Sequence, residues 1–175
     1  AKPFLHRRDI SSKRMATESR IFLEEQAVPR ELINAYSTLA KDCEQTAASL
    51  LSTMTKRDMQ RVHGDCHTGN ILWRDDTPHF VDLDDCVSGP AIQDIWMFLS
   101  GDRFQQERQL SEFVSGYEEF HEFDPRQLAW IEALRTLRIM HHAFWLASRW
   151  DDPAFPRAFP WFGQARFWSD HILEL

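Results

Sequence analysis

The sequence predicts a mainly α-helical domain of the α+β class, in which one or two very short β elements carry the polar motifs. Before residue 55 and after residue 90, apolar residues recur every three or four positions, a spacing typical of amphipathic helices. Near the centre, two short apolar runs at 71–73 and 79–81 flank a polar turn that contains a proline. That pattern is typical of a small β-hairpin.

The composition is that of a single globular domain. The chain has 175 residues, 43% hydrophobic and 13% aromatic, which is enough for a sizeable core and too aromatic for a disordered chain. The formal net charge of −7 provides no basic surface for phosphates, so we expect neither nucleic acid nor an anionic membrane as partner. No apolar run approaches the ~20 residues of a membrane helix, and residues 1–10 lack a signal-peptide core.

The three cysteines also bear on location. They are an odd number at wide spacing, without a CxxC pair, and so predict reduced thiols rather than a disulfide frame or a zinc knuckle. We therefore expect a cytoplasmic protein, and we expect it to be a monomer.

The first part of the chain divides into a linker and helices. Residues 1–16 are mixed and basic and are expected to be a linker or the cut edge of a longer protein, leaving 17–175 as the folded domain. A short helix is predicted over 18–26, and a longer one begins at Pro29, a residue suited to the first helical turn. The longer helix is predicted to bury one apolar stripe: Leu32, Tyr36, Leu39, Cys43, Ala47, Leu50 and Met54.

The last part of the chain is predicted to be helical throughout. Pro90 is expected to open a helix that Gly101 closes, and apolar spacing predicts further helices over 104–120 and 125–150. A final helix is expected to begin near Gln164, after a stretch rich in proline and aromatic residues.

Two polar clusters border the predicted hairpin. His63-x-Asp65-x-x-x-x-Asn70 precedes its first apolar run, and Asp82 follows the second, twelve positions after Asn70. A strand, a turn and a returning strand would bring Asn70 and Asp82 together, and amide and carboxylate oxygens are ligands that Mg²⁺ prefers. Asp65 would then lie at the lip of the same loop, where it could accept a proton from a hydroxyl, as a base does in phosphoryl transfer.

Three segments together resemble a known superfamily. Residues 63–72 (HGDCHTGNIL), 81–85 (VDLDD) and 90–96 (PAIQDIW) are similar to the aminoglycoside phosphotransferase/choline kinase superfamily, which has the protein-kinase-like fold. Cys66, Trp73 and the Trp-rich tail resemble in particular the bacterial stress-response Ser/Thr protein kinases. The resemblance implies an ATP-dependent phosphotransferase, of which this chain is the C-terminal helical lobe with a small β-hairpin that carries the catalytic and metal motifs.

The resemblance also implies roles for residues that handle the reactants. Asp65 matches the catalytic proton acceptor, and Asn70 and Asp82 match the ligands of the Mg²⁺ that accompanies ATP, Asp82 being counted among the catalytic residues too. Leu72 matches the position that floors the adenine pocket.

Three further matches are supports rather than reagents. Asp94 matches a helix aspartate whose carboxylate accepts hydrogen bonds from the backbone of the catalytic loop. His63 and His67 match family positions that hold the same loop in place.

One departure from the family is large. The six glycines never approach G-x-G-x-x-G spacing, and none of the four lysines lies in a strand ahead of a helix with a paired glutamate. We therefore expect the N-terminal β-lobe to be absent from this chain. Because positioning and electrostatics supply nearly all of the catalysis in phosphoryl transfer, the chain alone is expected to be close to inert.

The expected reaction is transfer of the γ-phosphoryl group of MgATP to a protein Ser/Thr hydroxyl. The alternatives are a kinase acting on a small alcohol, amino alcohol or aminoglycoside-like compound, and a non-catalytic pseudokinase-like binding module. An iron site of His63, Asp65 and His121 or His141 is disfavoured because too few strands are predicted. A phosphatase with Asp82 and Asp84 is disfavoured because repeated βαβ units and a downstream lysine are missing.

Overall fold

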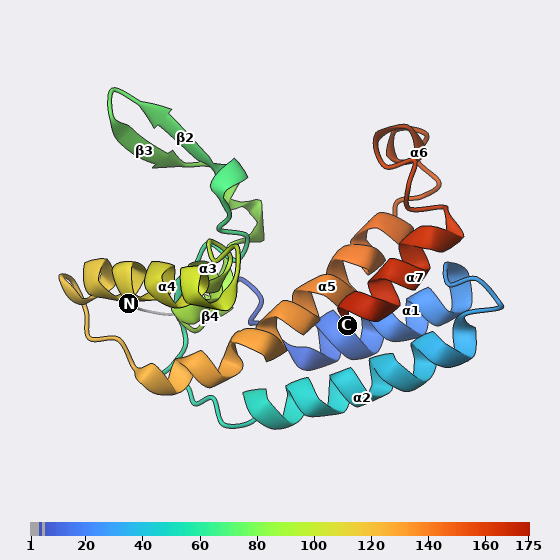
Figure 1. The fold of residues 1–175 in the computed structure, drawn as a ribbon, viewed down its shortest axis with the longest axis horizontal. Helices are drawn as coiled ribbons and strands as arrows, with labels where there is room; N and C mark the ends of the chain where they lie inside the picture. The colour runs from blue at the N-terminus through green and yellow to red at the C-terminus, as the bar shows by residue number, and fades with distance from the viewer. Residues whose placement is uncertain (1–3, 5) are drawn as a thin grey trace. The chain divides into compact units, whose positions relative to one another are not determined.

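The computed structural model describes residue 4 and residues 6–175 (Figure 1). The chain forms two compact units, and each is discontinuous in sequence. The first comprises Ala1–Ile10 and Met54–Ile131, and the second comprises Ser11–Thr53 and Glu132–Leu175. Residues 1–3 and 5 of the predicted linker lie outside the described residues.

The first unit contains two small antiparallel sheets. β1 (Gln60–Val62) pairs with β4 (Val87–Gly89), and β2 (Ile71–Arg74) pairs with β3 (Thr77–Phe80). β2 and β3 form the predicted hairpin, which is drawn in green in Figure 1. Its two turn residues, Asp75 and Asp76, have φ of 51° and 57°, the conformation of the tight turns whose twist suits hairpin strands.

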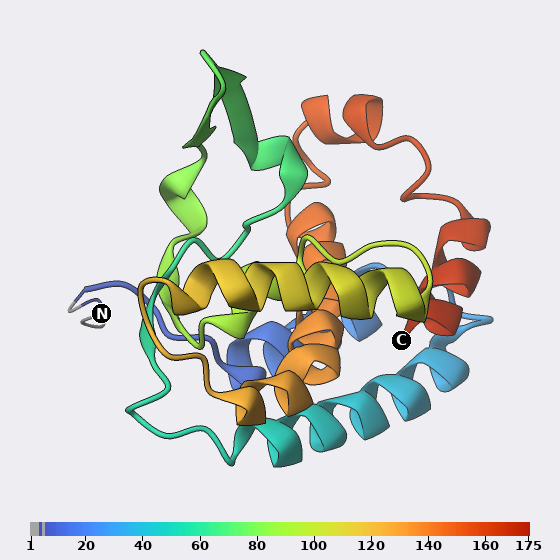
Figure 2. The same cartoon turned by 60° about the vertical axis from the view of Figure 1, so that its left-hand side comes forward.

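The helices of the first unit are short, with one exception. The 3₁₀ turns are η2 (Thr68–Asn70), η3 (Leu83–Asp85) and η4 (Pro125–Trp130). α3 (Ile92–Trp96) covers only part of the helix expected from Pro90 to Gly101. α4 (Arg103–Glu118) agrees with the helix expected over 104–120, and Figure 2 shows it side-on. A capping box between Asp102 and Gln105 starts α4 and satisfies backbone groups at the helix end.

Residues 6–10 belong to the first unit. The N–H of Ile10 donates to the carbonyl of Ser88 at 3.0 Å, and the N–H of Ser88 donates to the carbonyl of Arg8 at 3.1 Å. A parallel bridge between Asp9 and Ser88 accompanies these bonds. This part of the stretch expected to be a linker therefore lies along β4.

The second unit is entirely helical. Its elements are η1 (Lys13–Glu18), α1 (Ser19–Gln26), α2 (Ile33–Leu51), α5 (Ile131–Ala147), α6 (Ala154–Ala158) and α7 (Ala165–Glu174). Leu23, Tyr36, Leu137, Leu146 and Trp168 are among its fully buried side chains. The rings of Tyr36 and Trp168 pack in a T-shaped arrangement, with centroids 6.1 Å apart, so that α2 and α7 share an aromatic core.

Three details of the helix predictions are wrong. α2 begins at Ile33 rather than at Pro29, because residues 30–32 form a turn. The buried face of α2 includes Ala40 and Leu51, whereas Leu50 is exposed. The helix expected over 125–150 starts as the 3₁₀ segment η4 and becomes α-helical only at α5, which ends at Ala147. Among the described residues, no helix is long and apolar enough to cross a membrane.

Candidate active site

A half-buried carboxylate holds the loop that follows β1. This loop, residues 63–67, is here called the HGD loop. The N–H groups of His63 and Gly64 donate to the two carboxylate oxygens of Asp94, at 2.7 and 2.9 Å. Asp94 lies on the short helix α3, so one side chain fixes the start of the loop. Burial raises the pKa of Asp94, and the two backbone hydrogen bonds oppose that shift without cancelling it.

Gly64 brings the HGD loop close to the turn that follows β3. Its φ is +85°, and a Cβ atom there would lie 2.3 Å from the carbonyl oxygen of Asp85. Only glycine has both the backbone freedom and the small size for this approach. The HGD loop and residues 82–85, here called the DLDD turn, are therefore in direct backbone contact.

Asn70 is oriented by the backbone of Asp65. Its side-chain nitrogen donates to the Asp65 carbonyl at 2.9 Å, and the residue is buried. Val81 then joins the two polar clusters. Its N–H donates to the Asn70 carbonyl at 3.0 Å, and its carbonyl accepts from Nε2 of His63 at 2.8 Å. Asp82 follows directly, so the structure brings His63, Asp65, Asn70 and Asp82 to one end of the hairpin.

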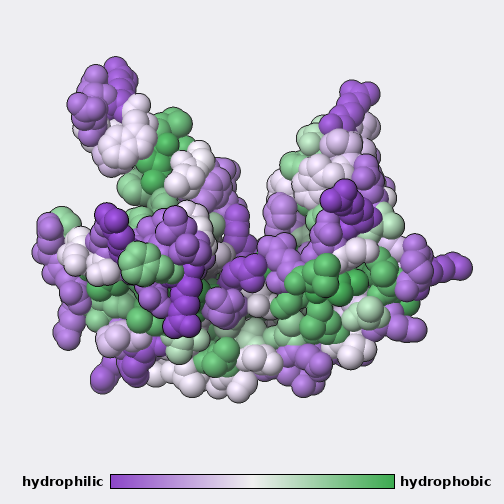
Figure 3. Space-filling model, in the orientation of Figure 1, coloured by the Kyte–Doolittle hydropathy of each residue, from purple (hydrophilic) through white to green (hydrophobic). Residues whose placement is uncertain are grey.

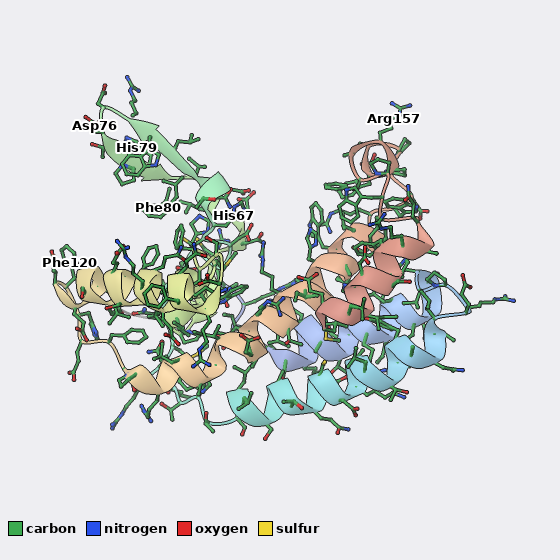
Figure 4. The ribbon with its side chains drawn as sticks, in the orientation of Figure 1. His67, Asp76, His79, Phe80, Phe120 and Arg157 are labelled. Atoms are coloured by element: carbon green, nitrogen blue, oxygen red, sulfur yellow. The ribbon has the colours of Figure 1, made fainter. Side chains whose placement is uncertain are left out.

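His67 lies where the HGD loop meets the hairpin (Figure 4). Its Nδ1 accepts the N–H of Gly69 at 3.0 Å, which caps η2. The proton of a neutral His67 ring is therefore on Nε2, and this atom lies 3.6 Å from Oδ2 of Asp65. His67 thus faces the Asp65 carboxylate with a donor.

Asp82 has left-handed backbone geometry, with φ and ψ both 60°. Arg7 binds the DLDD turn. Its Nη1 donates to the carbonyl oxygen of Asp84 at 2.6 Å and lies 3.3 Å from the carbonyl oxygen of Leu83. No pattern in the sequence singles out Arg7, because its partners Leu83 and Asp84 are far away along the chain.

Gln93 belongs to the motif at 90–96, but the sequence analysis assigned it no role. Its Nε2 donates to the Gly64 carbonyl at 3.0 Å, and its Oε1 accepts from Nε1 of Trp96 at 3.4 Å. The residue is buried, and a buried amide requires hydrogen-bond partners. The sequence feature that could have indicated a role for Gln93 is a glutamine among the apolar residues of a short helix, next to Asp94.

Leu72 lies on the hairpin, where it pairs with His79, and its side chain is 56% exposed. Trp73 and Phe80 on the same hairpin are exposed as well, and Figure 3 shows apolar surface there. Cys66 is buried instead, and burial raises the pKa of its thiol to about 12, so that the thiol stays protonated at neutral pH.

The iron-site alternative has no support in the geometry. Among the described residues, no three His, Cys, Asp or Glu side chains gather so that they could hold a metal ion. Asn70 and Asp82 are a different donor set, an amide and a carboxylate that would share the ion with phosphate oxygens and water.

Residues 3–131 match the model of the phosphotransferase enzyme family. The chain belongs to the phosphotransferase enzyme family. This confirms the superfamily that the motifs at 63–72, 81–85 and 90–96 resemble. The match covers the whole of the HGD loop, the hairpin, the DLDD turn and α4.

Curated relatives of this chain are bacterial kinases. The chain is 43% identical over 165 residues to stress response kinase A of Escherichia coli (strain K12), covering 94% of this chain and 50% of the relative. It is 43% identical over 170 residues to serine/threonine protein kinase RdoA of Salmonella typhimurium (strain LT2), covering 96% and 51%. The chain therefore spans about half the length of these relatives.

Solved structures share the fold of this chain. An amicoumacin kinase in complex with AMP-PNP, Ca²⁺ and Ami matches with a TM-score of 0.57 and 22% identity, over 83% of this chain and 47% of that one. A spectinomycin phosphotransferase in complex with ADP and spectinomycin matches with a TM-score of 0.57 and 15% identity, over 96% and 52%. The expected helix-rich fold with small antiparallel sheets is confirmed at this level.

Proposed function

We propose that the protein carrying this chain is an ATP-dependent Ser/Thr protein kinase that transfers the γ-phosphoryl group of MgATP to a protein hydroxyl. The observation that carries the proposal is the bridge made by Val81, whose two backbone groups join Asn70 and His63 beside Asp82. Through these two hydrogen bonds, the segment that carries Asp65 and Asn70 adjoins the segment that carries Asp82. A base and two metal ligands are the side chains that phosphoryl transfer needs.

In this proposal Asp65 accepts the proton of the substrate hydroxyl. The donor Nε2 of His67 faces its carboxylate, and the side-chain nitrogen of Asn70 is bonded to its carbonyl. Both contacts restrict the position of Asp65, and a base contributes to the rate only when it is held within reach of the proton.

Asn70 and Asp82 are proposed to hold Mg²⁺. The side-chain nitrogen of Asn70 donates a hydrogen bond to the Asp65 carbonyl, so its side-chain oxygen Oδ1 is the atom available to a cation. Asp82 adds a carboxylate. This donor set fits a hard ion that keeps part of its shell for phosphate and water. When bound, the ion would neutralise charge on the phosphate oxygens. Leu72 is proposed to contact the adenine ring.

His63, His67 and Asp94 are proposed as supports of this arrangement. Asp94 fixes the HGD loop at its start, His63 ties it to the strand before Asp82, and His67 caps the turn that ends at Asn70. None of the three is assigned a proton-transfer step.

A protein substrate is preferred because the relatives at 43% identity are named as a stress response kinase and a Ser/Thr protein kinase. A small hydroxyl compound is the second candidate, because the fold neighbours are an amicoumacin kinase and a spectinomycin phosphotransferase. We further propose that residues 17–175 are the C-terminal lobe of a longer cytoplasmic, monomeric kinase, that 1–16 join it to a nucleotide-binding β-lobe, and that the lobe alone is nearly inert.

The test uses the longest natural protein that contains this chain, incubated with labelled ATP and Mg²⁺. We expect label on Ser and Thr of a generic protein such as casein, and none on an aminoglycoside. Asp65→Asn should lower kcat by about 10²–10⁴-fold while the affinity for ATP stays within about twofold. Label on the small compound alone would exclude a protein kinase, and an active Asp65→Asn variant would remove the assigned base.

A further inference from the structure

The first unit contains a groove that the proposed phosphotransfer does not use. Its volume is about 710 Å³, and it runs between α4, β1, α3 and the base of the hairpin. Phe80 marks one end, and Figure 4 shows it at the base of the hairpin above α4. Asp65, Asn70 and Asp82 do not line the groove. Its size is that of pockets which hold small organic molecules, typically about 300–1,000 Å³.

One face of α4 forms a wall of this groove. Glu112, Phe113, Gly116 and Tyr117 share that face, because residues one, four and five positions apart lie on one side of a helix. None of the residues of α4 is buried, so this face is not filled by the unit's own core. The wall is therefore available to an occupant.

Gly116 keeps the wall open. Glycine inside a helix destabilises it relative to alanine and is usually retained for close packing or a special backbone angle. Neither reason applies here, because a Cβ atom at this position would meet nothing within 4 Å and φ is not in the left-handed region. What the missing side chain provides is empty space on the groove side of α4.

The other walls are mostly aromatic. Phe98 and Phe113 stack at 5.0 Å between ring centroids with an interplanar angle of 23°, and the Phe80 ring is half exposed at the end of the groove. The hydroxyl of Tyr117 accepts a hydrogen bond from Gln60 at 3.3 Å and supplies a polar group that can orient a ligand. Aromatic walls of this kind favour a flat ring, which they contact by offset stacking or edge to face.

Two of the charged side chains in the lining already have hydrogen-bond or ion-pair partners. Glu112 is paired with Arg108 at 3.1 Å, and both oxygens of Asp94 accept backbone N–H groups. The guanidinium of Arg61 lies over the Phe4 ring, 5.0 Å from its centroid. Arg61 is exposed, so its charge stays in water. An ionic ligand held against the aromatic walls would lose its hydration without gaining a buried counter-charge, and this loss is expensive.

We propose that this groove binds an uncharged, ring-containing small molecule. The volume sets the size of the ligand, the aromatic walls and the open space at Gly116 set its shape, and the compensated charges set its neutrality. The proposed base Asp65 and the proposed metal ligands Asn70 and Asp82 do not line the groove, although the supporting residues His63 and Asp94 do. The proposal does not depend on the roles assigned to these residues.

The test measures binding to the full chain by ligand-observed NMR with three probes that share one ring and differ in charge: indole, indoleacetate and tryptamine. Indole is expected to bind saturably, and each charged probe at least about tenfold more weakly, because its charge must be desolvated. Two variants at one position separate binding from folding. Gly116→Ala should raise the thermal midpoint and keep indole affinity within about threefold, whereas Gly116→Leu should lower the affinity at least about tenfold without lowering the midpoint.

Any of three results would overturn the proposal: no saturable indole binding, equal binding of the three probes, or unchanged binding by Gly116→Leu. Sedimentation velocity adds one more decision. If the unaltered chain self-associates, Gly116→Leu abolishes the association and indole does not bind, then a second copy of the chain occupies the groove and the small-molecule proposal is wrong.

Discussion

The carboxylate of Asp94 accepts the backbone N–H of His63 at 2.7 Å, with its second oxygen on the next N–H along the chain at 2.9 Å. One side chain on a five-residue helix thereby fixes two successive peptide groups of the HGD loop. Everything that the loop presents, including Asp65, depends on this bidentate contact.

Replacing Asp94 by asparagine should therefore destabilise the first unit. Asn has one acceptor oxygen, and its NH₂ group would face an N–H group that has lost its partner. We expect Asp94→Asn to lower the free energy of unfolding by about 1–3 kcal/mol, measured by urea denaturation. Asp94→Glu keeps both oxygens and is the control for charge; an Asn variant as stable as the wild type would contradict the stated role.

Gln93 should act on position rather than on chemistry. Its amide donates to the Gly64 carbonyl, which lies in the peptide group directly before Asp65. In Gln93→Leu that buried carbonyl loses its donor, and we expect the unfolding free energy to fall by about 1–3 kcal/mol. If the proposed function holds, kcat should fall while KM for ATP stays unchanged. Gln93→Glu is the matched variant, because it keeps the size of the side chain and removes the N–H donor. If either variant changes only the KM for ATP and leaves kcat unaltered, Gln93 does not have a positioning role.

Gly64 and Gly116 should respond in opposite directions to alanine. At Gly64 the methyl group would meet the Asp85 carbonyl at 2.3 Å with φ at +85°, whereas at Gly116 it would meet nothing within 4 Å. We expect Gly64→Ala to destabilise by about 2 kcal/mol or more, and Gly116→Ala to stabilise by about 0.5–1 kcal/mol. Paired thermal melts of the two variants test both; two shifts of the same sign would be inconsistent with the described backbone.

The second unit should lose stability in mild acid because of His171. Its ring lies between those of Tyr36 and Phe167, and burial, together with the nearby His142, lowers its pKa to about 4 from the ordinary 6.5. The unfolded state then binds the proton more readily than the folded state. The contribution is fully present above pH 6.5 and is lost as pH falls toward 4, by about 3 kcal/mol in all.

Denaturant titrations of the wild type and of His171→Phe across this pH range measure that loss. The phenylalanine keeps the ring between Tyr36 and Phe167 and cannot be protonated, so its unfolding free energy should vary less between pH 6.5 and 4. An identical slope for both proteins would show that other groups control the acid sensitivity.

The sequence predicted those parts of the fold that depend on short-range order. Helix α4 and the hairpin both follow from residue spacing over fewer than twenty positions. The stripe on α2 was wrong where a small residue, Ala40, is buried in place of the larger Leu50, because tertiary packing decided the helix orientation.

Long-range contacts explain what the sequence could not predict. Arg7 reaches carbonyls 76 and 77 residues away, and Gln93 reaches Gly64 across 29 residues, so no local window contains both partners. The start of the helix expected over 125–150 was wrong as well. Residues Pro125–Trp130 form a 3₁₀ segment, and the chain passes from the first unit to the second directly after it.

The interleaving of the two units has a consequence for synthesis on the ribosome. Neither unit is one continuous stretch of chain: the segment Ser11–Thr53 must wait for Glu132–Leu175 before its unit is complete. The first unit, finished at Ile131, is therefore able to assemble while the aromatic surfaces of α1 and α2 still lack their partners. Nascent chains that stall between these two points would expose those helices and would be the species most in need of chaperones.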